Sequence, residues 1–447
     1  MAGIALEQGG GILSLAPAWV PRAFCRPGRR IKLHPDDYYA LGTERGGIDE
    51  RWLSSTINAD NGPLTGPLEG LSEIVVADGG RERRLTLRDA IDTCGSDMVG
   101  ERLWAEFGGW PMYAKFFDNQ GPLPFHIHQR DEHVAFENAR GKPEAYYFPP
   151  QLNNHGGDFP FTFFGLDPAT TKEDVRDRLE AFATGDNRIT DLSRAYRLRP
   201  GTGWNVPEGV LHAPGSLCTY EPQRASDVFA MFESVADGRA VPEDLLWKDS
   251  PPERRGDVEH LLSLVDWEAN LDPDFARHHF MAPVPMREGS YDERWICYAS
   301  DAFSAKELTV RPGQSVITRD AACYGLIVVQ GHGTVGTWEV ESPTLIRLGQ
   351  MTRDELFVTE AAAKEGVAVK NPSPCEPLVI LKHFGPGNPD LAAERPRGAP
   401  GLTQRDVRRQ SSLKTSSSAG GPASGTRAPS SSAIASCQRA FTSWSAM

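Results

Sequence analysis

Residues 122–133 read PLPFHIHQRDEH, and this stretch decides how the chain is interpreted because it places two histidines two residues apart. Residues i and i+2 of a β-strand point to the same face, so His126 and His128 would project side by side. A third histidine, His212, follows in residues 207–216, PEGVLHAPGS. Imidazoles joined by one carboxylate suit zinc, iron, manganese, cobalt or nickel. The sequence therefore predicts one divalent metal ion inside a small β-barrel.

The composition favours a mostly β protein and argues against several classes. The 447 residues include 44 glycines and 35 prolines, which indicates many turns. A net charge of −13 argues against nucleic acid as a partner. The sequence contains neither an apolar run long enough to span a membrane nor the basic start of a signal peptide. The seven cysteines are scattered without a CxxC pair, which fits a reducing, cytoplasmic location.

We expect two barrels and a tail. Residues 1–282 would form an N-terminal metal-binding domain, with helical insertions at 85–103 and 167–184. Residues 283–390 would form a second barrel, whose strands include FSAKELTV, YGLIVVQ and PLVILKHF. This barrel lacks an HxH pair, so we expect it to be metal-free, with His332 and His383 in structural or surface roles. Residues 391–447 are rich in Ser, Ala, Gly, Arg and Pro, which predicts a disordered tail.

The two histidine segments resemble the paired metal motifs of the cupin superfamily. The pattern G-x4-HxH-x3-E covers Gly121 to Glu132, and PxGxxH covers Pro207 to His212. Within that superfamily the chain looks most like the type I mannose-6-phosphate isomerases, because HIHQRDEHV, GKPEAYYF and PEGVLHAPG occur in that family's order. ERWLS upstream and QRASD downstream also fit, so the resemblance runs from about residue 50 to about residue 235.

The resemblance implies a jelly-roll fold with helical insertions and a set of metal ligands. These would be His126, His128, Glu144 and His212, with zinc as the first choice of metal and iron or manganese as alternatives. Glu132 fits the general cupin spacing and is the alternative carboxylate; otherwise it would orient an imidazole. Lys142 and Lys115 match lysines that line the family's pocket, and they are the candidate catalytic residues.

Two positions depart from the isomerase pattern. His126 stands where the family has glutamine, and Met231 stands where it has an arginine that follows the Ser-Asp pair. A thioether cannot stabilise a developing negative charge, and losing such a group costs ~10²-fold or more in rate. Two other histidines are not expected to be ligands: His34, in the sequence LHPDDY, and His155, which we place at the pocket rim.

Three functions remain open. The motif order favours a metal-dependent aldose–ketose isomerase acting on a sugar or sugar phosphate. Three imidazoles with one carboxylate would also suit an iron-dependent cupin dioxygenase. Met231 favours a non-catalytic sugar-binding cupin. In each case the expected partner is a small molecule, with neither nucleic acid nor membrane involved.

Overall fold

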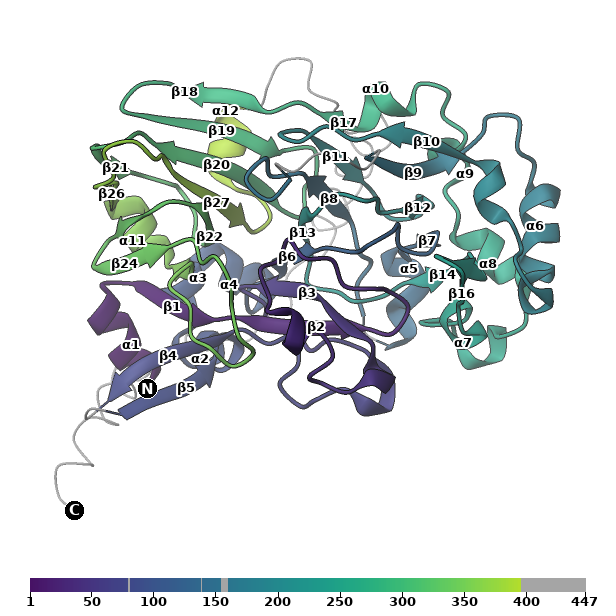
Figure 1. Cartoon of the computed structure of the whole chain (residues 1–447), viewed down its shortest axis with the longest axis horizontal. Coiled ribbons are helices and arrows are strands. Elements are labelled where there is room, and N and C mark those ends of the chain that lie inside the picture. The colour runs from purple at the N-terminus through teal and green to yellow at the C-terminus, as the bar shows by residue number, and fades with distance from the viewer. Residues whose placement is uncertain (79–80, 138, 154–159, 395–447) are drawn as a thin grey trace, which may run out of the picture. The chain divides into compact units, whose positions relative to one another are not determined.

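The first two thirds of the chain build two antiparallel sheets, and the histidine motifs lie on the smaller of them (Figure 1). The structure, a computed structural model, describes residues 1–78, 81–137, 139–153 and 160–394. The seven-stranded sheet has the order β17 (Phe280–Met281), β11 (Gly203–Val206), β8 (Glu144–Tyr147), β13 (Thr219–Arg224), β6 (Met112–Phe117), β3 (Gly47–Leu53) and β2 (Ala18–Arg22). The five-stranded sheet has the order β10 (Ser193–Arg197), β9 (Phe161–Leu166), β12 (His212–Ala213), β7 (His126–Ile127) and β14 (Ala230–Met231). A small hairpin joins β15 (Val235–Ala236) to β16 (Arg239–Ala240).

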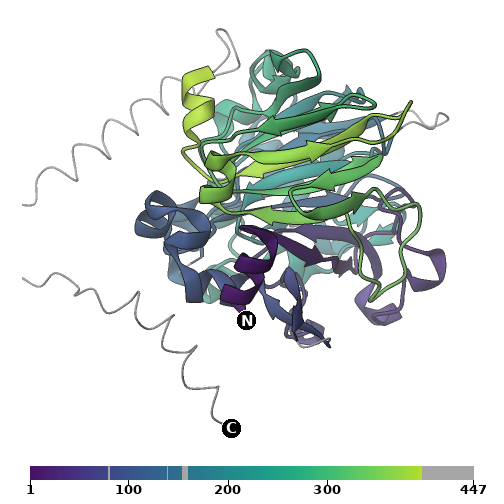
Figure 2. The same ribbon diagram turned by 90° about the vertical axis from the view of Figure 1, so that its left-hand side faces the viewer.

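A nine-stranded sheet combines the second half of the chain with its N-terminal end, and its strands run side by side in Figure 2. Its order is β18 (Val284–Arg287), β19 (Tyr291–Cys297), β20 (Ser304–Val310), β27 (Leu378–Phe384), β22 (Tyr324–Gln330), β25 (Glu355–Val358), β1 (Ile12–Ala16), β4 (Glu73–Asp78) and β5 (Arg81–Thr86). A four-stranded sheet contains β21 (Ser315–Thr318), β26 (Val367–Lys370), β23 (His332–Val335) and β24 (Trp338–Glu341). The pairing of Ile12 with Val358 joins the two ends of the folded chain.

Short helices fill the connections. They are α1 (Ala2–Gly9), α2 (Leu87–Cys94), α3 (Ser96–Val99), α4 (Glu101–Phe107), α5 (Asp131–Val134), α6 (Lys172–Glu180), α7 (Glu243–Leu246), α8 (Val258–Leu264), α9 (Trp267–Asn270), α10 (Phe275–His279), α11 (Glu360–Glu365) and α12 (Pro389–Glu394). The insertion at 85–103 is helical but not one helix, because Gly95 and Gly100 adopt φ values of 52° and 86° and end α2 and α3. The insertion at 167–184 contains α6, which begins at a capping box between Thr171 and Asp174. None of the helices in the described residues is long and apolar enough to cross a membrane.

The seven-stranded sheet is buried on both faces, and its alternating side chains separate two environments. One face carries Phe116, Tyr147 and Tyr220 into a core shared with the nine-stranded sheet. The other face points toward the histidines. Beyond the five-stranded sheet, Ile127 and Leu211 pack with residues of α6 and α8 in a second core. The candidate site therefore lies between two sheets, each of which has an apolar core behind it.

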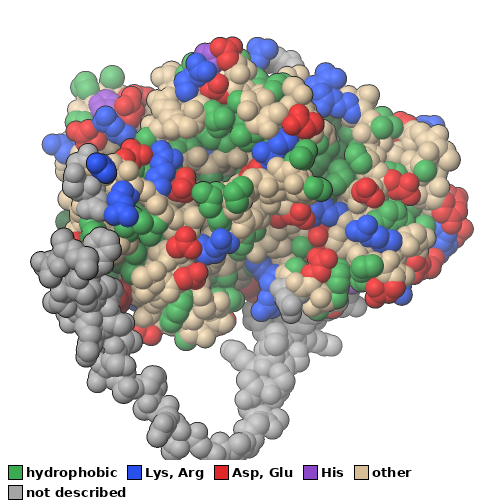
Figure 3. Space-filling view, turned by 90° about the horizontal axis from the view of Figure 1, so that it is seen from below, with side chains coloured by type: hydrophobic (Ala, Val, Ile, Leu, Met, Phe, Trp, Pro, Cys, Tyr) green, Lys and Arg blue, Asp and Glu red, His purple; other side chains and the backbone are tan. Residues whose placement is uncertain are grey.

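The described residues, up to Glu394, belong to one compact unit. The division into two domains at 282/283 stays a prediction. The nine-stranded sheet contains strands from both sides of it, because β1, β4 and β5 complete that sheet. The predicted tail needs a correction at its start, because residues 391–394 belong to α12. The rest of the tail lies outside the described residues. On the face drawn in Figure 3, Lys and Arg are interspersed with Asp and Glu, without the continuous basic surface typical of nucleic-acid binding.

Candidate metal centre

The three predicted histidines come together in the five-stranded sheet. His126 on β7 pairs directly with His212 on β12, and His128 follows two residues after His126 on the same side. One ring nitrogen of each lies within 4.8 Å of the others, an arrangement that could hold a metal ion. The exposed fractions are 4% for His126, 2% for His128 and 0% for His212. The spacing of the HxH motif thus has the predicted consequence.

The PxGxxH motif positions the third histidine through a tight turn. Gly209 adopts φ 81°, and its amide donates to the carbonyl of His128 at 2.9 Å. A Cβ at this position would lie 2.9 Å from Arg130 Nη1 and 3.1 Å from Asp266 Cβ. Glycine is required because the turn needs both a left-handed backbone and close approach of its neighbours. The turn therefore connects the two histidine motifs directly.

Backbone carbonyls orient all three imidazoles. The Nδ1 atoms of His126, His128 and His212 lie 2.7, 2.8 and 2.8 Å from the carbonyl oxygens of Pro124, Val228 and Val210. A carbonyl can only accept, so each Nδ1 carries the proton and each Nε2 presents a lone pair. This arrangement leaves three Nε2 atoms as potential metal ligands.

Glu144 faces these nitrogens from β8 of the opposite sheet. Its two carboxylate oxygens lie 3.0 Å from His128 Nε2 and 3.1 Å from His212 Nε2. Both partners in these contacts are acceptors. Lys142 Nζ lies 3.1 Å from both Glu144 Oε2 and His128 Nε2, whereas His212 Nε2 is buried without a hydrogen-bond partner. Buried lone pairs that face one another are costly unless a cation lies among them. The donor set of three imidazoles and one carboxylate therefore fits a divalent metal ion.

The other candidates lie elsewhere or outside the described residues. The side chain of Glu132 is 52% exposed and bonds to Arg130, so it neither faces the histidines nor orients one. His34 caps a turn by accepting from the amide of Asp36. His332 is exposed on β23, and His383 is buried on β27, where Nδ1 contacts Tyr220 Oη at 2.9 Å. His155 lies outside the described residues.

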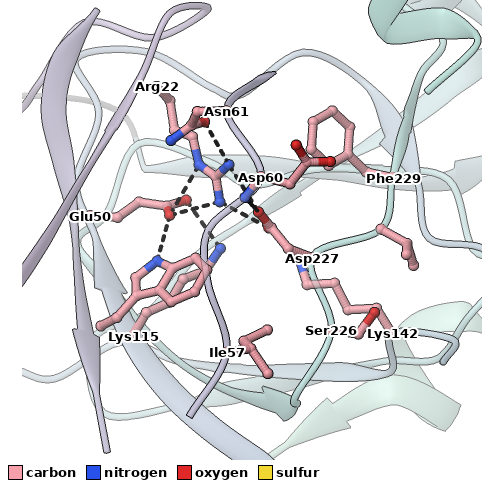
Figure 4. Close-up of polar contacts among 12 residues, drawn as sticks. Arg22, Glu50, Ile57, Asp60, Asn61, Lys115, Lys142, Ser226, Asp227 and Phe229 are labelled. Carbon is pink, nitrogen blue, oxygen red and sulfur yellow. Dashed lines mark hydrogen bonds and ion pairs between the residues drawn. The ribbon is translucent and has the colours of Figure 1, made fainter. Parts of the chain in front are cut away.

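A chain of buried ion pairs extends from Glu144 across the inner face of the seven-stranded sheet. Lys142 Nζ lies 3.1 Å from Glu144 and 3.7 Å from Glu221, and Lys115 Nζ lies 3.3 Å from Glu221 and 3.1 Å from Glu50. Arg22 continues the chain at 3.1 Å from Glu50 and 2.9 Å from Asp227 (Figure 4). The side chains in this series, which we call the charge chain, are at most 6% exposed. Acids and bases alternate along it, so each buried charge has an opposite neighbour.

Both predicted catalytic lysines belong to the charge chain. Lys142 is nearer to the candidate metal ligands, because its Nζ also lies 3.1 Å from His128 Nε2. Four other members were not predicted as site residues: Arg22, Glu50, Glu221 and Asp227. A signal for Glu50 exists in the sequence, since Glu50-x-Trp52, like Lys115-x-Phe117 and Glu144-x-Tyr146, places a charge two residues before an aromatic ring. Residues two apart on a strand share a face, so all three pairs point into the site.

Burial and neighbouring charges together shift the pKa values at this site. Burial, with help from Lys142, lowers the pKa of His128 to about 3. Burial alone would raise the pKa of Glu144, but Lys142 and His128 outweigh it and hold that pKa well below its usual range. Burial and the charge of Glu144 raise the pKa of Glu221 to about 8. The site therefore holds one carboxyl group that favours ionisation beside one that resists it.

Met231 occupies β14, where it pairs with His126 and is 2% exposed. Its thioether is thus buried in the strand next to the histidines. Arg22 comes from β2, and its guanidinium is fully committed to Glu50, Asp227 and Asn61. No N–H group of Arg22 is therefore free to bind a substrate anion. An arginine at position 231 would supply such a group.

Comparisons with known proteins give matches in structure. A search of family models finds no match, and a search of curated protein sequences finds none either. Mannose 6-phosphate isomerase from Bacillus subtilis superposes with a TM-score of 0.55 at 15% identity, covering 84% of this chain and 99% of that one. A mutant of phosphomannose isomerase from Salmonella typhimurium gives 0.54 at 12% identity, covering 84% and 100%. A zinc-bound mannose 6-phosphate isomerase gives 0.55 at 13% identity, with the same coverage.

The mainly β architecture and these matches define a cupin fold, as the paired motifs predicted. More particularly, the chain has the fold of the mannose-6-phosphate isomerases, and the match extends over nearly the whole length of those proteins. At 12–15% identity the likeness concerns the fold.

Proposed function

We propose that this protein is a metal-dependent aldose–ketose isomerase acting on a small sugar or sugar phosphate. The observation that carries the proposal is the placement of three imidazoles and Glu144 beside buried lysines, within an isomerase fold. The ligands would be His126, His128, Glu144 and His212, and zinc is the metal that we infer. A divalent metal there would polarise a carbonyl and the adjacent hydroxyl of an open-chain sugar.

The charge chain supplies the groups that would move protons. Glu221 Oε1 is buried without a hydrogen bond, and Lys115 and Lys142 lie on either side of it. We assign Glu221 the transfer of a proton between the two reacting carbons, since a carboxylate can remove a proton and return it. Lys142 would hold a substrate oxygen close to the metal ligands. Lys115 would hold Glu221 in position.

The substrate is expected to differ from mannose 6-phosphate. The neighbouring isomerases are named for that sugar, but Met231 supplies no positive charge here. We therefore expect weak turnover of mannose 6-phosphate and better turnover of another aldose or ketose.

A second function is favoured by His126. Three imidazoles with one carboxylate also suit iron, and an iron-dependent dioxygenase would use the same ligands. Metal analysis separates the two functions, because stoichiometric iron favours the dioxygenase and zinc favours the isomerase.

The test combines metal analysis with a screen for sugar and sugar-phosphate isomerisation. Wild-type protein should bind a single divalent ion per chain, and His128→Ala should lose it. His278→Ala is the matched control, because His278 is an exposed histidine on α10 that bonds to Asp272. Unchanged metal content in His128→Ala would refute the site. Bound metal without isomerisation of any sugar would refute the activity.

A further inference from the structure

The candidate metal centre is enclosed on most sides by packed apolar cores. The residues behind the histidines belong to the core around Ile127 and Leu211. The residues behind Glu144 belong to the core shared with the nine-stranded sheet. A third core, which includes Tyr146, Phe164, Trp204 and Phe275, fills the barrel beyond Glu144. A small molecule would have to displace a packed core to enter through any of these sides.

On another side, at the Arg22 and Asp227 end of the charge chain, a loop contacts Asp227, whose neighbour Val228 holds the His128 imidazole through its carbonyl. Residues 56–71 connect β3 to β4 and bring Ser72 back to Ser55, just beyond the end of β3. Between 56 and 69, Ala59 alone is buried. Figure 4 shows the segment that carries Ile57 and Asp60 crossing between Glu50 and Lys115 on one side and Asp227 and Lys142 on the other. Beneath it, Ala59 joins a small cluster with Val20, Trp52 and Tyr113.

The loop has the closed neck of an Ω-loop. Ser72 N donates to Ser55 O at 3.0 Å, and Ser55 N donates to Ser72 Oγ at 2.9 Å. Inside the loop, Ala59 N donates to Glu69 O at 3.0 Å. Residues with positive φ flank the neck, namely Ser54 at 52° and Gly70 at 85°. Such a loop holds its own shape, so it can move as a unit about its neck.

The tip of the loop is fastened to the far side of the site. Asp60 Oδ2 lies 2.8 Å from Lys248 Nζ, and the Asp60 amide donates to Asp227 Oδ2 at 3.0 Å. Arg22 Nη1 donates to Asn61 Oδ1 at 3.0 Å. The side chain of Asp60 is 57% exposed, so its ion pair with Lys248 is a weak, reversible contact. Further contacts, from Arg45 to Glu69 and from Arg88 to Asn58, hold other parts of the loop.

We propose that residues 56–71 are a gate over the candidate metal centre and that the Asp60–Lys248 ion pair latches it shut. The proposal rests on the proposed function only for the identity of what enters. The gate would admit a small polar molecule to Lys142 and the three imidazoles, and would then exclude water from them. Lids of this kind protect reactive intermediates and often limit turnover.

The test uses metal-free, full-length protein, so it is independent of metal and of sugar. In Asp60→Asn the loop keeps its shape and its backbone bond to Asp227 but loses the charge of the latch. Asp191→Asn is the matched control, since Asp191 forms an exposed ion pair with Arg188 away from the loop. Two rates are measured: amide hydrogen exchange in 56–71, and carbethoxylation of His128 followed by mass spectrometry. Exposed His278 serves as the internal reference.

We expect both rates to rise about two- to fivefold in Asp60→Asn, the factor that an exposed ion pair is worth, and neither to change in Asp191→Asn. Faster loop exchange with unchanged labelling of His128 would show that the loop does not control access, and would overturn the proposal. Unchanged loop exchange would overturn the latch. If wild-type protein bound no metal, the proposed function would fail while these two rates would still decide the gate.

Discussion

Within the charge chain, replacement of Glu50 should lower the free energy of unfolding most. Glu50 is 3% exposed and accepts from Arg22 Nε at 3.1 Å, Trp52 Nε1 at 2.8 Å and Lys115 Nζ at 3.1 Å. Burial would raise its pKa, but Arg22 and Lys115 outweigh that effect and hold the pKa below its usual value. Glu50→Gln preserves size and the bond from Trp52 and removes one charge from between two buried cations.

The magnitude follows from what each cation retains. Removing one partner of a buried ion pair destabilises proteins by about 3–5 kcal/mol. Arg22 keeps Asp227 and Lys115 keeps Glu221, so the lower end of that range applies. We expect Glu50→Gln to lower the free energy of unfolding by about 3 kcal/mol. Urea denaturation monitored by tryptophan fluorescence measures this change.

The control is Glu339→Gln, which breaks an exposed pair with Arg353 and should change stability by less than about 0.5 kcal/mol. The double variant Glu50→Gln with Lys115→Met removes both charges, so it should lose less stability than the sum of the two single variants. A loss below about 1 kcal/mol in Glu50→Gln, or simple additivity in the double variant, would refute the view that this chain is a set of coupled buried charges.

Three further predictions concern other parts of the molecule. Met231→Arg should raise mannose 6-phosphate turnover, by up to ~10²-fold if the guanidinium meets the developing charge; wild-type turnover at ~10 s⁻¹ or more would show that Met231 is no handicap. Burial raises the pKa of Glu355 to about 7, so this group's contribution to stability is present below its unfolded pKa of about 4.3 and is lost as the pH rises through 7. Glu355→Gln should therefore gain about 3 kcal/mol over wild type at pH 8 and little at pH 4, measured as unfolding free energies at the two pH values. Truncation after Pro400 should leave the melting temperature and metal content unchanged, because the sequence beyond it has no apolar pattern; a large fall in melting temperature would contradict this.

Local patterns in the sequence were enough to predict several residues of the candidate metal centre. His126 and His128 were predicted to share a face because strand geometry is regular over two residues, and the turn at Gly209 was marked by its own motif. Arg22 was not foreseen, since its place depends on β2 pairing with β3 and on contact with Asp227, 205 residues away in the chain. Such pairings are decided by tertiary packing, which a single strand does not encode.

The fold shows the same limit. Alternation predicted the strands of the second barrel, but nothing local indicated that β1 would pair with β25, at the other end of the folded chain. The insertion at 85–103 was expected from its apolar spacing, whereas its breaks are due to Gly95 and Gly100 in conformations that end a helix. Periodicity therefore located the elements, and glycine conformation and long-range pairing decided their lengths and neighbours.

The two-faced character of the seven-stranded sheet has a consequence for dissecting the protein. A fragment that ended at residue 282 would keep every candidate ligand. The rings of Phe116 and Tyr220 would be exposed to solvent, because they pack in the core shared with the nine-stranded sheet. Arg51 would lose the two acids of the other half that hold it, Asp354 and Glu355. Such a fragment should aggregate rather than work as a miniature enzyme. The half of the protein that follows residue 282 has no candidate metal ligand. It is nevertheless required, because it covers the apolar face of the sheet whose other face points toward the ligands.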